Sequence, residues 1–378
     1  MADVLVYRAE GRAVVEGGDL YGFTVTEWNL PATYPPFAAL LFVPLTWPPL
    51  AVTKTLFVAG NAALLALLVH LSLKLAGRRT TPAVLLAATA AGLWLEPVFQ
   101  TMFFGQINLA LACLVLWDLT RPDGARGRGL AIGVAAGIKL TPAVFAVHLL
   151  LTGRVRAGLI ALAGFVGTVA VGAAVLPGAS VEFWTRRMFE TGRVGKAWIV
   201  DNQSLKGLVA RLLHTPDPGL WWALPTAAVG LLGLWLARRA HVAYGREGWG
   251  VLIIAGTALL VSPISWSHHW VWCVPLLAVM AAPAPTAAPA AAAPATAWRR
   301  WPVYAVAAVF TARTLWLVPH AGDLDLHLPW WQQPLASPYP LPVLALLAYA
   351  AWHLRRPRSG SLRPHFPYAV HREQTRRA

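Results

Sequence analysis

Long apolar runs separated by short basic segments dominate this chain. A helix needs roughly 20 apolar residues to cross a bilayer, and fewer where it is short and broken. The pattern predicts an all-α polytopic membrane protein with roughly nine or ten transmembrane helices. The apolar runs fall at 51–75, 82–98, 104–119, 157–176, 219–237, 248–263, 268–281, 301–318 and 340–354.

The basic segments indicate which way the chain is inserted. Loops rich in Lys and Arg stay on the cytoplasmic side of a membrane. If the basic segments all face the cytoplasm, the opposite side holds 1–35, 177–218 and shorter connections at 99–103, 264–267 and 319–339. The sequence therefore predicts a multi-pass protein of the cell membrane. The basic segments fall at 74–79, 121–128, 154–156, 238–246, 299–300 and 355–378.

One apolar stretch, 129–152, has basic loops on both sides, so a single crossing would place one loop outside. Two half-length helices that meet at Lys139-Leu140-Thr141-Pro142 avoid this, because Pro142 and Gly137 both favour a break. Such a hairpin enters from the cytoplasm and holds Lys139 within the membrane. A second broken or re-entrant helix is predicted at 36–50, where prolines recur.

These patterns predict a single transmembrane domain over residues 1–354. Within it we expect a first outer loop at 1–35, a long outer loop at 177–218 and an Ala/Pro-rich cytoplasmic linker at 282–297. Residues 355–378 read as a basic, disordered cytoplasmic tail resting on anionic membrane lipids.

Composition supports the membrane interpretation. The chain is 57% hydrophobic and only 12% charged, whereas soluble domains carry about 25% charged residues. Its 19 Trp fit membrane interfaces, so soluble enzymes are excluded. The net charge of +15 would suggest nucleic acid in a soluble chain. Here the charge lies in loops, so we expect no nucleic-acid partner. Cys113 and Cys273, both in apolar runs, form neither a disulfide framework nor a metal site.

Polar clusters on the outer side are the candidate functional groups, because polar residues in apolar surroundings are expensive. Asp3 is a candidate general base with Tyr7 beside it, or else a solvated loop carboxylate. Tyr34 precedes two prolines that make a rigid corner, and it can face a substrate. Gln106 and Asn108 stand at a membrane boundary, where their amides either bind sugar hydroxyls or cap a helix and bond between helices.

Three further clusters carry cationic, amide and aromatic groups. Lys139, between two half-helices, makes an anion site, the alternative being a side chain that reaches to the interface. Asn202 and Gln203 form either a sugar-binding edge or a helix cap. The third cluster contains Trp266, His268 and His269. Adjacent histidines diverge around a helix and have no acid or Cys beside them, so we expect no metal.

Five of the six clusters lie on the outer side, and Lys139 approaches it from within the bilayer. Together they describe an outward-facing pocket with an acid, amides, aromatic faces, His and Lys. Such a pocket suits a lipid-linked phosphosugar donor, whose tail lies in the bilayer and whose phosphate needs cations. The alternative is a multi-pass lipid or solute transporter or flippase, which also uses broken helices and midplane charge.

The motifs occur in an order that resembles glycosyltransferase family 87, the actinobacterial α-(1→2) mannosyltransferases that use polyprenol-phosphate-mannose. The similarity covers about residues 1–320. The motifs are Asp3 to Tyr7, Tyr34-Pro35-Pro36-Phe37, Gly105-Gln106-Ile107-Asn108, Lys139-Leu140-Thr141-Pro142, Asn202-Gln203-Ser204 and Ser262-Pro263-Ile264-Ser265-Trp266-Ser267-His268-His269.

This resemblance implies a GT-C-type fold and inverting transfer to a glycolipid or lipoglycan on the extracytoplasmic face, with no cofactor. It implies that Asp3 is the catalytic base. Lys139 with His268 or His269 then becomes the candidate site for the donor phosphate. Family members have a transmembrane helix before the loop that carries the Asp, so we expect such a helix upstream of Met1.

Overall fold

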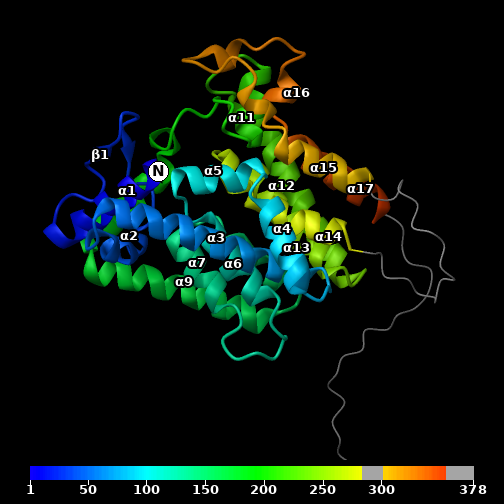
Figure 1. Ribbon diagram of the computed structural model, residues 1–378, viewed down its shortest axis with the longest axis horizontal. Coiled ribbons are helices and arrows are strands. Elements are labelled where there is room, and N and C mark those ends of the chain that lie inside the picture. The colour runs from blue at the N-terminus through cyan, green and yellow to red at the C-terminus, as the bar shows by residue number, and fades with distance from the viewer. Residues whose placement is uncertain (283–300, 355–378) are drawn as a thin grey trace, which may run out of the picture.

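The computed structural model describes residues 1–282 and 301–354, which form an assembly of helices (Figure 1). The predicted Ala/Pro linker and the basic tail lie outside these residues. The α-helices are α1 (Ala2–Glu16), α2 (Pro36–Phe42), α3 (Leu50–Leu75), α4 (Pro82–Gly92), α5 (Glu96–Phe104), α6 (Asn108–Leu119), α7 (Leu130–Ile138), α8 (Ala143–Leu151), α9 (Val155–Val175), α10 (Pro177–Thr185), α11 (Leu205–Leu212), α12 (Gly219–Val242), α13 (Glu247–Val261), α14 (Cys273–Met280), α15 (Trp301–Thr311), α16 (Gln333–Ala336) and α17 (Pro340–His353).

Short 3-10 helices and one small sheet complete the secondary structure. Strands β1 (Thr24–Val25) and β2 (Leu30–Pro31) pair antiparallel, with Val25 opposite Leu30. The 3-10 helices are η1 (Val43–Thr46), η2 (Arg187–Phe189), η3 (Thr191–Arg193), η4 (Ser267–Trp272), η6 (Thr314–Trp316) and η7 (Leu324–His327). The connection 177–218 therefore contains α10, η2, η3 and α11 and is not an open loop.

The predicted apolar runs coincide with helices, but many of these helices are short. Three of them, α3, α9 and α12, are long and apolar enough to cross a membrane. A fourth candidate is the pair α4 and α5, which meet at a bend of 75°. By length and composition, the described residues thus supply fewer full-length spans than the nine or ten predicted. The reason is that the runs 104–119 and 340–354 contain the helices α6 and α17, which have only 12 and 14 residues.

The first predicted loop, 1–35, begins with a helix. α1 packs against η1 so closely that a Cβ on Gly11 would meet the Phe42 carbonyl oxygen at 2.5 Å. Arg8 ties the two together by donating to the carbonyl oxygens of Leu45 (2.9 Å) and Pro48 (2.6 Å). The buried face of α1 carries polar side chains such as Glu10. A hydrophobic helical period is therefore absent, which is why the sequence pattern gave no helix here.

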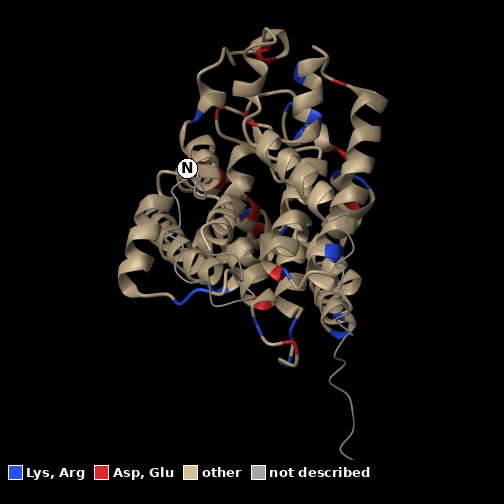
Figure 2. Ribbon diagram, turned by 90° about the vertical axis from the view of Figure 1, so that its right-hand side faces the viewer, with Lys and Arg blue, Asp and Glu red and all other residues tan. Residues whose placement is uncertain are grey.

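Three basic loops lie at one end of the molecule, where salt bridges join them. Asp123, between α6 and α7, contacts Arg154, between α8 and α9, at 2.9 Å. Arg154 also contacts Glu247 at the start of α13 at 2.6 Å. Figure 2 shows basic residues on the loops at the bottom of the molecule. Three of the six predicted basic segments thus lie close together, and the side of the membrane on which they lie stays a prediction.

The predicted hairpin is present as α7 and α8. Both helices have one end at the basic loops, since α7 follows Gly129 and α8 precedes Arg154. The Gly129 N–H donates to both oxygens of the buried Asp118 carboxylate (2.8 Å each), which fixes the start of α7. The hairpin turns at 139–142, with Lys139 in extended conformation directly after α7. Lys139 therefore stands at the apex, as predicted.

Close packing of α7 on α9 sets the position of this apex. Gly129, Gly133 and Gly137 recur at four-residue spacing along one side of α7. A Cβ on Gly133 would overlap the carbonyl oxygen of Ala161 in α9, and one on Gly137 would overlap the Thr168 side chain. Small residues at this spacing let two helix backbones approach, which is a common means of packing helices in membranes.

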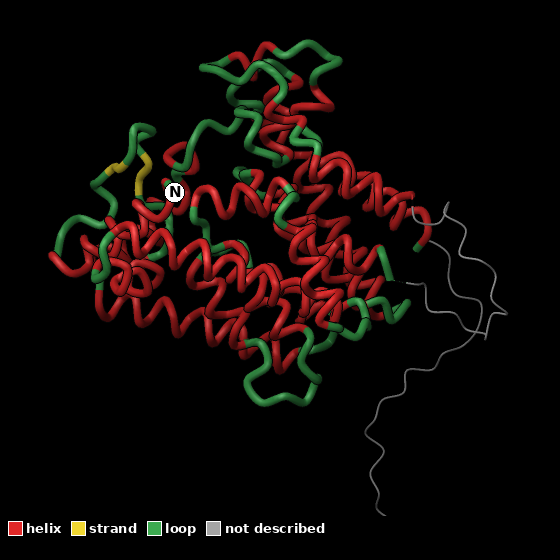
Figure 3. Tube along the Cα trace, viewed as in Figure 1, coloured by secondary structure: helices red, strands yellow, loops and turns green. Residues whose placement is uncertain are grey.

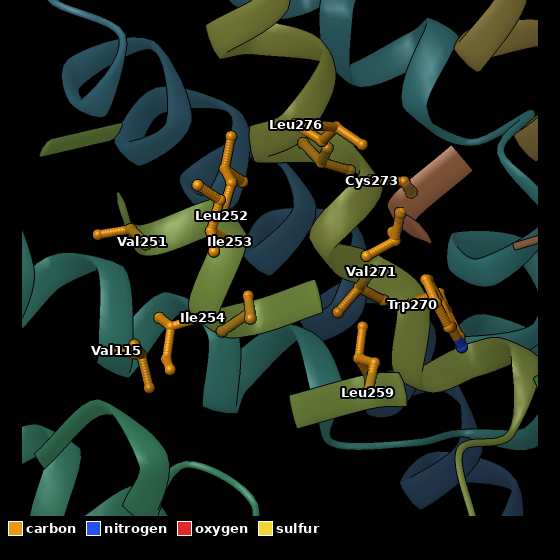
Figure 4. Close-up of a cluster of buried hydrophobic side chains, with 14 of the residues drawn as sticks. Val115, Val251, Leu252, Ile253, Ile254, Leu259, Trp270, Val271, Cys273 and Leu276 are labelled. Atoms are coloured by element: carbon orange, nitrogen blue, oxygen red, sulfur yellow. The ribbon is translucent and has the colours of Figure 1, made fainter. Parts of the chain in front are cut away.

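The main hydrophobic core lies where α13, η4 and α14 meet the central helices. Figure 4 shows Leu259 of α13 close to Val271 and Trp270 of η4, while Val251, Leu252, Ile253 and Ile254 of α13 lie on the other side of the same cluster. Cys113 and Cys273 are both buried in this core as free thiols. Apolar side chains of the long helices instead remain exposed, among them Leu56, Val166 and Leu231. Such exposed apolar surfaces are expected to face lipid.

We predict that Gly133→Ala destabilises the protein, because the added methyl group forces α7 away from the α9 backbone. Overpacking of this kind costs about 1–3 kcal/mol. Thermal unfolding in detergent micelles should show a lower midpoint for this variant. Gly167→Ala is the matched control, since a Cβ at this position on α9 meets nothing within 4 Å. An unchanged midpoint for Gly133→Ala would contradict the packing argument.

Candidate functional site

A cavity of about 900 Å³ lies at the other end of α6 and α7 from the basic loops. Asp118 at the basic loops and Asn108 near the cavity are ten residues apart in α6, which corresponds to about 15 Å. Figure 3 shows loops around α11 and α16 at the top and the α6–α7 loop at the bottom. Seven of the predicted site residues line the cavity: Asp3, Tyr34, Gln106, Lys139, Trp266, His268 and His269.

Asp3 reaches the cavity from the first turn of α1. It is partly buried, and Tyr7 lies one turn further along the same helix. Burial raises the pKa of the Asp3 carboxyl to about 6, while a hydrogen bond from Gln106 and the positive charge of Lys139 lower it. The carboxyl therefore exchanges its proton near neutral pH, which suits a general base.

A buried hydrogen-bond network orients the Gln106 side chain toward Asp3. The Tyr7 hydroxyl donates to Gln106 Oε1 at 3.0 Å, and the Tyr34 hydroxyl donates to the same oxygen at 3.2 Å. Because two hydroxyls occupy the amide oxygen, the NH₂ group is the end that faces Asp3. Tyr7 is fully buried behind this layer, so it positions Gln106 and does not line the cavity.

Lys139 is held at the hairpin apex by three partners. Its Nζ donates to Asn108 Oδ1 at 3.2 Å and to His269 Nε2 at 3.0 Å, and it lies 5.4 Å from the centre of the Tyr34 ring. An ammonium group cannot accept a hydrogen bond, so His269 Nε2 is the acceptor and the proton of this ring is on Nδ1. Asn108 thus acts from behind the cavity wall by positioning Lys139.

The two histidines of η4 diverge as expected for adjacent residues. Their ring centroids are 4.8 Å apart with nearly perpendicular planes, and His268 also packs against Phe104 at 5.6 Å. The His268 carbonyl accepts from Asn108 Nδ2 at 3.0 Å, which fixes η4 against α6. Within residues 1–282 and 301–354, no group of three or more His, Cys, Asp or Glu could hold a metal ion.

The side chains of Asn202 and Gln203 lie behind the cavity wall and bond to the backbone. Asn202 Nδ2 donates to the carbonyl oxygens of Ala197 (2.7 Å) and Pro263 (3.0 Å), and Gln203 Nε2 donates to that of Ala336 (2.8 Å). With their amides engaged in this way, both residues fix the loop and do not offer a sugar-binding edge. The expectation that they bind substrate is therefore corrected.

Sequence reasoning missed several polar residues of the cavity wall. Asp201 lines the cavity directly before Asn202, so the right cluster was found but the adjacent carboxylate was passed over. Arg187, Trp316, His320 and Asp325 also line it. These four come from connections between helices and stand in no compact motif, so no sequence signal marks them.

The sequence of this chain is similar to those of known proteins. The model of glycosyltransferase family 87 matches residues 32–263. A polyprenol-phosphate-mannose-dependent alpha-(1-2)-phosphatidylinositol mannoside mannosyltransferase of Mycobacterium tuberculosis is 37% identical, over 74% of this chain and 69% of that protein. A Mycolicibacterium smegmatis protein of the same name is 35% identical, over 89% and 80% of the two chains. No solved structure gives a significant match.

We predict that Arg211→Met strongly destabilises the segment that closes the cavity. The buried guanidinium donates to the carbonyl oxygens of Trp198 (3.1 Å), Ile199 (2.9 Å) and Asn202 (3.2 Å). Leaving these acceptors unpaired should cost about 3 kcal/mol or more. Thermal unfolding measures the effect.

The control for this substitution is Arg186→Met, which removes an arginine whose partner Glu190 stands 2.7 Å away near the surface. An exposed ion pair contributes only about 0–1 kcal/mol. Equal losses of stability in the two variants would show that Arg211 does not hold the segment.

Proposed function

Since this chain belongs to glycosyltransferase family 87, we propose that it transfers mannose from polyprenyl-phosphate-mannose to a glycolipid acceptor in α-1,2 linkage. The observation that carries this proposal is the meeting of a carboxylate and a partly buried ammonium group in one cavity. Asp3 and Lys139 line the same cavity, and the positive charge of Lys139 lowers the pKa of the Asp3 carboxyl. The relatives named for phosphatidylinositol mannosides make such a mannoside the first acceptor to test.

Asp3 is the general base of the proposed reaction. It takes the proton from an acceptor hydroxyl while the hydroxyl oxygen forms a bond to C1 of the donor mannose. The bond between C1 and the phosphate oxygen breaks, and polyprenyl phosphate leaves with the electron pair. General-base catalysis contributes roughly 10²–10⁴ in rate. Gln106 supports this role, because its NH₂ group fixes the Asp3 carboxylate.

Lys139 holds the donor phosphate and stabilises it as it leaves. A fixed positive charge in a water-poor site is effective, because it needs no reorganisation as the negative charge develops. Asn108 and His269 keep the Lys139 ammonium group aimed at one place. His268 lines the same part of the cavity and shapes it for the phosphate.

The reaction is placed on the extracytoplasmic face of the cell membrane, in a multi-pass arrangement. The support is that the basic loops joined by Asp123, Arg154 and Glu247 gather at one end, and the cavity lies at the other end of α6 and α7. Basic loops face the cytoplasm. A transporter or flippase would instead need polar groups along a path to both faces.

Asp3→Asn is expected to reduce transfer at least about 100-fold, because the amide cannot accept the proton. The measurement follows radiolabelled mannose from polyprenyl-phosphate-mannose into glycolipid in membranes, with linkage analysis of the product. Glu16→Gln, an exposed position on the same helix, is the control and should keep full activity. Full activity of Asp3→Asn would remove Asp3 as the base. A wild-type protein that moves the intact donor across vesicles without transfer would favour the transporter.

The pH dependence of kcat/KM should report the same group. Burial raises the pKa of Asp3 to about 6, so the base is ionised above this pH and protonated below it. kcat/KM is therefore expected to fall about tenfold per pH unit below about pH 6 and to level off above about pH 7. A rate that stays constant through this range would contradict the assignment of Asp3.

A further inference from the structure

A second carboxylate, Asp201, lines the cavity and has no part in the chemistry proposed above. Its Oδ1 accepts a hydrogen bond from the Ser267 backbone N–H at 3.0 Å. The Ser267 side chain also hydrogen-bonds this carboxyl. An ionised carboxylate has two oxygens and about four acceptor positions, so these two bonds leave capacity for a ligand. Asp201 is partly buried, and burial raises the pKa of its carboxyl to about 6, with the carboxylates of Glu96 and Asp3 adding to the increase.

The segment that carries Asp201 is held rigidly. Arg211 binds the carbonyl oxygens of Ile199 and Asn202 on one side, and Asp325 Oδ2 accepts from the Val200 N–H at 2.6 Å. On the other side, the Gln203 N–H donates to the Ser265 carbonyl at 2.8 Å. A side chain presented from such a segment has little freedom to move, which is the property expected of a specificity-determining contact.

An aromatic ring, that of Trp266, lines the same cavity as this carboxylate. Asn202 and Trp266 form an antiparallel bridge, so Asp201 and Trp266 come from two directly paired segments and line the same cavity. A Cβ on Gly195 would meet the Trp266 indole at 2.9–3.0 Å, so the glycine allows the ring its place against the backbone. A sugar ring has an apolar C–H face and a polar rim of hydroxyls, which match an aromatic face and a carboxylate respectively.

The charges in the cavity favour different positions for the donor phosphate and for the acceptor sugar. A negative carboxylate repels a phosphate, whereas Lys139 attracts it. The donor phosphate therefore belongs with Lys139, and the neutral sugar of the acceptor fits beside Asp201. The backbone bond to Ser267 also links this site to η4, which carries His268 and His269.

We propose that Asp201 binds hydroxyl groups of the acceptor's terminal sugar ring, with Trp266 against the face of that ring. This assignment rests on the proposed function, because it presumes a sugar acceptor. It makes Asp201 a specificity-determining residue, while Asp3 remains the base.

Asp201→Asn tests the proposal, because the amide oxygen can still accept from the Ser267 N–H while the charge is lost. We expect KM for a mannoside acceptor to rise about tenfold or more, with kcat at saturating acceptor and KM for the donor within about twofold of wild type. Asp323→Asn is the matched control, since Asp323 is exposed and pairs with Lys196 at 2.7 Å. A loss of kcat without a change in acceptor KM would overturn the proposal.

Acceptors that lack single hydroxyl groups identify the contact. Removing the hydroxyl that Asp201 binds should weaken binding of the acceptor to the wild-type protein about tenfold. The same deoxy acceptor should bind the Asp201→Asn variant as tightly as the complete acceptor does, because the contact is already lost. If removal of each hydroxyl weakens binding by the same factor in the wild-type protein and in the Asp201→Asn variant, the assignment is overturned. A lower thermal midpoint for Asp201→Asn than for Asp323→Asn, with acceptor affinity unchanged, would show that Asp201 only holds η4.

Equilibrium binding of the mannoside glycolipid to protein in lipid nanodiscs separates this proposal from the proposed function, because it requires no turnover. If the wild-type protein binds the glycolipid and the Asp201→Asn variant binds it more weakly, the acceptor site is supported even when no mannose is transferred. Wild type that transfers mannose while the two proteins bind the acceptor equally would retain the proposed function and reject the role of Asp201.

Discussion

The partly buried ammonium group of Lys139 is the constraint on which the arrangement of the site depends. A charge removed from water is costly unless partners replace the lost solvation. Lys139 obtains them from Asn108, His269 and the Tyr34 ring, which belong to α6, η4 and the segment before α2. Each element must therefore reach the hairpin apex, and the requirement of one side chain determines where three distant segments meet.

The depth of that apex follows from packing at the other end of the hairpin. Gly129 allows α7 to start against α9 and gives its N–H to the Asp118 carboxylate. Gly133 and Gly137 then keep the two backbones close along the whole of α7. Salt bridges of Arg154 hold the neighbouring loops at the same end. The contacts that set the position of Lys139 thus lie along α7 and at the basic loops, at the end of the molecule opposite the cavity.

The sequence predicted those features that depend on apolar length and on helix breaks. The apolar run 51–75 forms the long helix α3, because its length matches the thickness of a bilayer. The break at 139–142 is present because Pro142 interrupts the helix at its own position in the chain. It failed where burial involves polar groups. The sequence pattern did not predict α1, because Glu10 and Tyr7 lie on its buried face. Asn202 looked like a binding residue, since an amide that bonds to the backbone cannot be told from one that bonds to a ligand until the fold is known.

The distribution of charge within the cavity is consistent with the proposed role of Asp3 as the general base. Asp3 is affected by the positive charge of Lys139, and its own charge in turn affects Asp201. It therefore stands within electrostatic reach of both a cationic and an anionic group. The leaving phosphate needs the cation, and a neutral hydroxyl-bearing acceptor tolerates the anion. In the proposed reaction, the Asp3 carboxylate is held by the NH₂ group of Gln106 and takes the proton of the acceptor hydroxyl that attacks C1 of the donor mannose.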